Sequence, residues 1–83
     1  MDIRFTHHAK QKLGVLRRHG VIVSRTLVKR IIAHPDLIDH SRSPLLIAQG
    51  ALDSRHVLRV VYRIGESNVV VITFYPGRLR QYE

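Results

Sequence analysis

The feature that most constrains the fold is a pair of apolar segments separated by only four residues. The segments are "HVLRVVYRI" at 56–64 and "VVVITFY" at 69–75, and the loop between them is "GESN". Valine, isoleucine and aromatic residues favour strands, and a short glycine-containing loop between two strands predicts a β-hairpin. The last third of the chain is therefore expected to form an antiparallel pair of strands.

The alternation of side chains in this hairpin predicts which of them share a face. If Ile64 pairs with Val69 across the loop, Val60 pairs with Thr73. One face then carries four residues of the first strand: Leu58, Val60, Tyr62 and Ile64. The other face carries the remaining residues of both strands: Arg59, Val61, Arg63, Val70, Ile72 and Phe74. Buried guanidinium groups are costly, so we expect the arginine face to meet solvent or a ligand, unless a β-bulge shifts the register.

The residues before Pro35 have a helical period instead. Thr6 is a good N-cap for a helix that runs to about His19. Ser24 is a second N-cap, and Pro35 disfavours helix at His34 and so ends a second helix there.

Strands are expected at the remaining apolar segments. Segments 36–40 and 44–52 are predicted to be strands that extend the hairpin into a meander, and residues 2–5 form a short strand at the sheet edge. The order β-α-α-β-β-β-β predicts a single α+β domain over residues 1–83, in which two N-terminal helices pack on one face of a mainly antiparallel sheet. The uncovered face is where a ligand would lie.

Charge and composition restrict the partners. Fourteen Lys and Arg against six Asp and Glu give a formal net charge of +8, which favours a polyanion such as nucleic acid, or an acidic protein, as partner. The alternative is a basic surface without a partner. The chain has no cysteine, as is common in the reducing cytosol. We see no signal peptide, and the longest apolar run, 69–72, is too short for a membrane span. We therefore expect a cytoplasmic protein.

Two adjacent histidines stand at the start of the first helix. His7 points away from the predicted core stripe, whereas His8 lies at its edge, above Lys12. His8 either packs at the rim of the core or takes part in acid–base chemistry. No histidine pair has i, i+4 spacing and no cysteine is present, so we expect no metal site.

The segment "LRVVYRIGESNVVVITFYPGRLRQYE" resembles the C-terminal half of the RelE/ParE superfamily of toxin–antitoxin toxins. The N-terminal part, from "FTHHAKQKL" to "HPDLI", is similar to a RelE-like branch whose members open with an "HA" helix motif. The resemblance implies a curved antiparallel sheet and a type II toxin that is a metal-independent endoribonuclease without a cofactor. Such enzymes commonly cleave mRNA on the ribosome by attack of a 2′-OH on the adjacent phosphate, and an acidic antitoxin binds them.

By motif position, the resemblance assigns Arg59 to phosphate binding and makes Arg78 and Tyr82 the other catalytic candidates. We add His8 to this catalytic set. We expect RNA contacts from the remaining basic candidates: Lys12, Arg55, Arg63 and Arg80.

The sequence also departs from the family pattern. The lysine pair that some members carry before the "YR" strand is replaced here by Arg55 and His56, and "LR" stands for "YR". The alternative to a ribonuclease is a non-catalytic nucleic-acid-binding module or a gyrase-directed ParE-like module.

Overall fold

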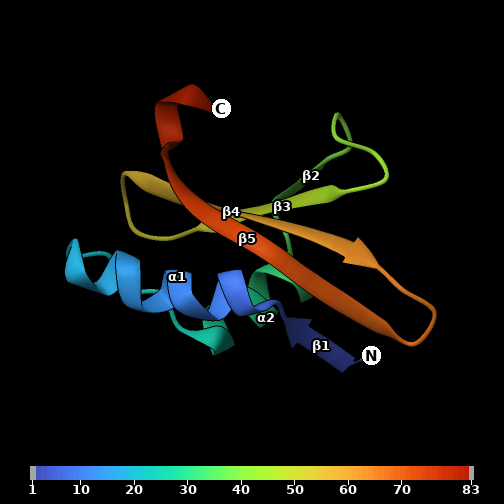
Figure 1. Cartoon of the computed structure of the whole chain (residues 1–83). Helices are drawn as coiled ribbons and strands as arrows, with labels where there is room; N and C mark the ends of the chain where they lie inside the picture. Colours follow the sequence, from blue (N-terminus) through green and yellow to red (C-terminus); the bar gives the residue numbers. More distant parts are fainter. Residues whose placement is uncertain (1, 83) are drawn as a thin grey trace.

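The computed structural model describes residues 2–82, which form two helices, five strands and a final 3-10 turn (Figure 1). In chain order the elements are β1 (Asp2–Phe5), α1 (His7–Arg18), α2 (Arg25–Ala33), β2 (Leu37–Asp39), β3 (Leu46–Ala51), β4 (His56–Ile64), β5 (Asn68–Arg78) and η1 (Leu79–Gln81).

Both helices begin at the predicted caps. The Thr6 hydroxyl accepts the amide of Ala9 at 3.1 Å, and the Ser24 hydroxyl accepts the amide of Leu27 at 3.0 Å. Each cap satisfies one of the amides that the first helical turn leaves unpaired. The second helix stops at Ala33, with His34 as its C-cap, as the proline after it requires.

The strands form one sheet in the order β1-β5-β4-β3-β2. The last four strands along the chain make an antiparallel meander, and β1 pairs in parallel with β5 at the sheet edge. Figure 1 shows α1 and α2 together on one side of this sheet. The predicted α+β class and the edge position of residues 2–5 are confirmed.

The core lies between the helices and the sheet. Ala9 and Val28 of the helices are fully buried there. The sheet contributes the following buried residues to the same cluster: Ala48, Leu58, Val60, Tyr62, Val69, Val71 and Phe74. The predicted core face of β4 is therefore correct at Leu58, Val60 and Tyr62, whereas Ile64 is 60% exposed beyond the end of the core.

A bulge in β5 changes the predicted pairing. Ile64 pairs with Val69 as expected, but the register shifts between Val61 and Tyr62, so that Val60 pairs with Phe74. The predicted pairing of Val60 with Thr73 is wrong. Because the extra residue of a bulge reverses the alternation beyond it, Phe74 points into the core and not to the arginine face.

The same strand is also longer than the sequence predicts. Pro76 and Gly77 do not end β5, because they continue to pair with Leu58 and Val57 up to Arg78. The chain then turns through η1 onto the sheet face that the helices leave uncovered, which we call the open face. Figure 1 shows this turn on the opposite side of the sheet from α1 and α2.

Candidate functional site

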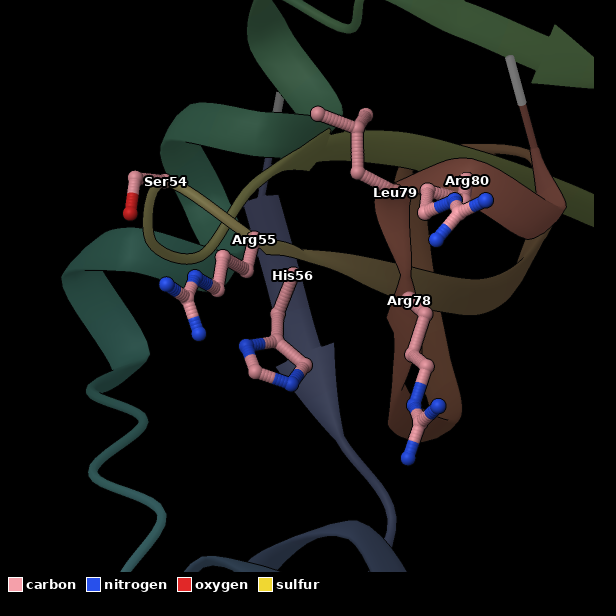
Figure 2. A pocket seen from close by; sticks show the side chains of 6 residues that line it. All are labelled: Ser54, Arg55, His56, Arg78, Leu79 and Arg80. Atoms are coloured by element: carbon pink, nitrogen blue, oxygen red, sulfur yellow. The ribbon is translucent and has the colours of Figure 1, made fainter.

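Three of the predicted basic residues meet at one end of the sheet. They line a hollow of about 550 Å³. Its walls are formed by Ser54, Arg55, His56, Arg78, Leu79 and Arg80. Figure 2 shows the His56 ring between the side chains of Arg55 and Arg78, and Arg80 next to Leu79 on the C-terminal turn.

The ends of β4 and β5 bring these residues together. His56 and Arg78 are direct partners in the β4–β5 ladder, so their side chains leave the sheet on the same face. The Leu79 amide donates to the Arg55 carbonyl at 2.9 Å, which ties the C-terminal turn to the turn before β4. The hollow is therefore bounded by two backbone segments that are hydrogen-bonded to each other.

Asp53 organises the turn that carries Arg55 and His56. Its Oδ1 atom accepts the Arg55 amide at 2.8 Å and the His56 amide at 2.9 Å, an arrangement typical of aspartate in turns. The same carboxylate lies 2.8 Å (Oδ1) and 3.0 Å (Oδ2) from the Nδ1 atom of His56. The hydrogen bond from the Arg55 backbone, followed by that from the His56 side chain, lowers the pKa of Asp53.

The electrostatics of the hollow favour an anion. Three guanidinium groups and an imidazole line it, and the nearby carboxylate of Asp53 is already hydrogen-bonded to the turn and to His56. Guanidinium groups bind phosphate by paired, charge-assisted hydrogen bonds. The hollow can therefore hold a phosphate group beside an imidazole.

Arg59, the residue to which the resemblance assigns phosphate binding, lies elsewhere. It is on the open face as predicted, but only 5% exposed. Its Nε donates to the Tyr75 hydroxyl at 3.1 Å. Its Nη1 donates to Gln49 Oε1 at 2.6 Å, and its Nη2 to Asp39 Oδ2 at 2.7 Å. Burial alone would lower the Arg59 pKa, but the hydrogen bonds to Tyr75 and Asp39 outweigh it and raise the pKa. The Arg59 guanidinium is therefore charged, and it holds together side chains of the neighbouring strands.

Tyr82 packs on this same arginine. The Arg59 Cζ atom lies 4.3 Å from the centroid of the Tyr82 ring, a cation–π geometry. The ring also lies against Gly77, where a Cβ atom would overlap the ring carbons of Tyr82. The C-terminal turn is thus held down on the open face by Arg59. This turn contains Arg80 of the hollow and follows directly after Arg78.

The other three predicted site residues do not line the hollow. His8 Nε2 lies 3.2 Å and Lys12 Nζ 3.5 Å from the Thr73 hydroxyl, so both side chains of α1 meet the bulged part of β5. Arg63 is exposed near the hairpin loop, where it pairs with Val70. The predicted set therefore separates into the hollow, the Arg59–Tyr82 contact, the His8–Lys12 pair and Arg63.

Several residues of these clusters were absent from the predicted set. His56 and Asp53 are the most important, and the "DSRH" spacing, an aspartate three residues before a histidine at a turn, is the signal that could have found them. The Arg59 partners Asp39, Gln49 and Tyr75 come from three different strands, and only the strand register brings them together.

Searches against protein-family models, curated proteins and solved structures find no match to this chain. Between residues 2 and 82, no group of three or more His, Cys, Asp or Glu side chains could hold a metal ion. No helix in this part of the chain is long and apolar enough to cross a membrane.

Proposed function

We propose that the protein is a RelE-like toxin that cleaves RNA without a metal, with the arginine hollow as its phosphate-binding site. The observation that carries the proposal is that Arg55, Arg78, Arg80 and His56 all line one hollow. Cleavage by 2′-OH attack needs cations to stabilise the charge of the phosphorane and an acid–base group beside the phosphate. The hollow contains both kinds of group.

In this proposal Arg78 takes over the phosphate-binding role that the resemblance assigns to Arg59, while Arg59 and Tyr82 support the site indirectly. The Arg59–Tyr82 contact fixes the turn η1, which carries Arg80 and begins directly after Arg78. A formal net charge of +8 would attract RNA to the whole surface, and the same excess suits an acidic antitoxin in the cytoplasm.

One observation favours the alternative, a nucleic-acid-binding or gyrase-directed module without catalysis. The guanidinium of Arg59 is already occupied by Asp39, Gln49 and Tyr75. If cleavage in this fold requires that arginine at the phosphate, the hollow would bind RNA or an acidic protein surface but would not cut.

The test is expression in bacteria with growth and full-length mRNA as readouts. We expect growth arrest and mRNA cleavage with the parent protein, and loss of both in an Arg55→Gln/Arg78→Gln variant. The matched control is Arg17→Gln/Arg18→Gln, which removes the same charge from exposed positions of α1 and should remain toxic. If the parent protein is folded but growth is normal and the transcripts stay intact, the proposed toxin function is refuted.

Purified protein separates the enzyme from the binder. RNA that is bound but never cut, free or on ribosomes, would support the non-catalytic module. Inhibition of DNA gyrase by the parent protein, with RNA left intact, would support the gyrase-directed ParE-like module.

A further inference from the structure

We infer that His56 is the general base of the hollow, and that its Nε2 atom accepts the 2′-OH proton of a bound RNA strand. This inference rests on the proposed ribonuclease function. It assigns a catalytic role to a residue outside the set that the family resemblance indicates, and a positioning role to Asp53.

The contact with Asp53 fixes which ring nitrogen is available. The pKa of Asp53 is lowered by its hydrogen bonds, so the group is a carboxylate at neutral pH and can only accept hydrogen bonds. At 2.8 Å its partner Nδ1 must carry the proton. In the neutral imidazole the lone pair then resides on Nε2, which is the form a general base needs.

The position of the ring fits this role. Nδ1 is held by the turn, and the rest of the ring extends between Arg55 and Arg78 (Figure 2). The charged groups around the ring are Asp53 and Arg55 from the turn before β4, and Arg78 and Arg80 from the end of β5 and η1. A phosphate held by these arginines would bring the neighbouring ribose to the imidazole.

The 2′-oxygen gives its proton to Nε2 of His56 and forms a bond to phosphorus, while the bond from phosphorus to the 5′-oxygen breaks. Water protonates the leaving 5′-oxygen, and the imidazolium later returns its proton to water. The products are a 2′,3′-cyclic phosphate and a 5′-hydroxyl end.

Asp53 is a positioning residue in this scheme. It holds the tautomer, fixes the ring through a two-oxygen contact, and its negative charge stabilises the imidazolium that forms. The side chains of His56 and Asp53 are 43% and 56% exposed, so either can be replaced without opening the core.

The experiment compares His56→Gln with His40→Gln, an exposed histidine outside the hollow. The substrate is a labelled mRNA, offered free and on ribosomes, and binding is measured on an analogue with 2′-deoxyriboses that cannot be cut. We expect His56→Gln to lose roughly 100-fold or more in cleavage rate, with binding within about threefold of the parent. His40→Gln should match the parent in both.

Asp53→Asn gives a second readout. Without the carboxylate that holds the Nδ1 proton of His56, we expect slower cleavage while binding of the 2′-deoxyribose analogue stays within about threefold of the parent. A purely structural role of Asp53 in the turn would weaken binding and cleavage together.

The outcomes distinguish the inference from the function on which it rests. A parent that cleaves no RNA, free or on ribosomes, refutes both. A parent that cleaves while His56→Gln retains its rate refutes the role of His56 as general base and leaves the ribonuclease standing.

Discussion

Arg59 joins four strands through one side chain. It stands on β4, and its guanidinium donates to Asp39 of β2, Gln49 of β3 and Tyr75 of β5. A buried charge is tolerated only when it is paired and hydrogen-bonded, and every one of these contacts requires the correct register of a different strand. We infer that the main role of Arg59 is to stabilise the sheet.

Replacing Arg59 with Met should therefore lower the free energy of unfolding. The amide oxygen of Gln49, a residue only 3% exposed, would lose its donor, and an unsatisfied buried group costs about 1–3 kcal/mol. Urea unfolding measures this loss. Arg63→Met is the matched control, since Arg63 is exposed on the same strand, and should change stability by less than about 0.5 kcal/mol. Equal effects of the two substitutions would contradict the role of Arg59.

Asp39 gives the same cluster a pH dependence. Hydrogen bonds from Ser41, its side chain first and then its backbone, and next the hydrogen bond from Arg59 lower the Asp39 pKa from its ordinary value of 3.8 to about 2. Because the pKa is depressed in the folded state, the stabilisation is fully present above the ordinary value and is lost as the pH falls through about 2.

We therefore expect the urea midpoint of the parent to fall between pH 4 and pH 2 more steeply than that of Asp39→Asn, which carries no titrating group at this position. Parallel curves for the two proteins over this range would show that the ionisation of Asp39 contributes nothing to stability.

Among the elements, the C-terminal turn depends most on a single small residue. Tyr82 can lie on β5 only because position 77 is glycine. Gly77→Ala should displace the ring and release η1 from Arg59, with the loss of a cation–π contact worth about 1–2 kcal/mol. Local opening should then increase about 5- to 30-fold.

Limited trypsin digestion measures this opening, because Arg78 directly before the turn and Arg80 within it are cleavage sites. Tyr82→Phe keeps a ring over Arg59 and should resemble the parent. Gly14→Ala is the control for the substitution itself: a Cβ at this helical position meets nothing within 4 Å, and we expect it to stabilise the protein by about 0.5–1 kcal/mol. Unchanged digestion of Gly77→Ala would show that the contact of Tyr82 with Gly77 and Arg59 does not hold the C-terminal turn.

The elements also show how far the sequence predicts this fold. The helices begin at Thr6 and Ser24 and the meander follows Pro35, because caps, proline and periodicity are local signals that tertiary contacts did not override here. The bulge was not predictable, because the run "VVVITFY" has no alternation of polar and apolar residues that would fix its register.

The candidate site was predictable only in part, for the same reason. Arg78 and Arg80 are recognisable in the sequence as a basic C-terminal segment. Their proximity to Arg55 and His56 is not recognisable, because it depends on the pairing of β4 with β5 as far as Arg78. The burial of Arg59 follows from partners on β2, β3 and β5. Long-range pairing of this kind has no signature in any single segment.

At the scale of the whole molecule, the net charge of +8 and the hollow make different contributions to nucleic-acid binding. Diffuse charge speeds the encounter with any polyanion, whereas side chains that contact phosphates release condensed counterions. The salt dependence of affinity separates the two contributions, because only direct phosphate contacts set the slope of log K against log salt.

For single-stranded RNA that slope is about −0.7 for each phosphate neutralised. An Arg78→Gln/Arg80→Gln variant should therefore bind RNA with a slope shallower by about 1.4 if each of these arginines contacts one phosphate. Arg17→Gln/Arg18→Gln lowers the net charge equally, but on α1, away from the hollow, and should bind somewhat more weakly with an unchanged slope. Binding measured from 50 to 300 mM salt tests this, and equal slopes for the two variants would mean that the whole basic surface holds RNA and the hollow has no special part.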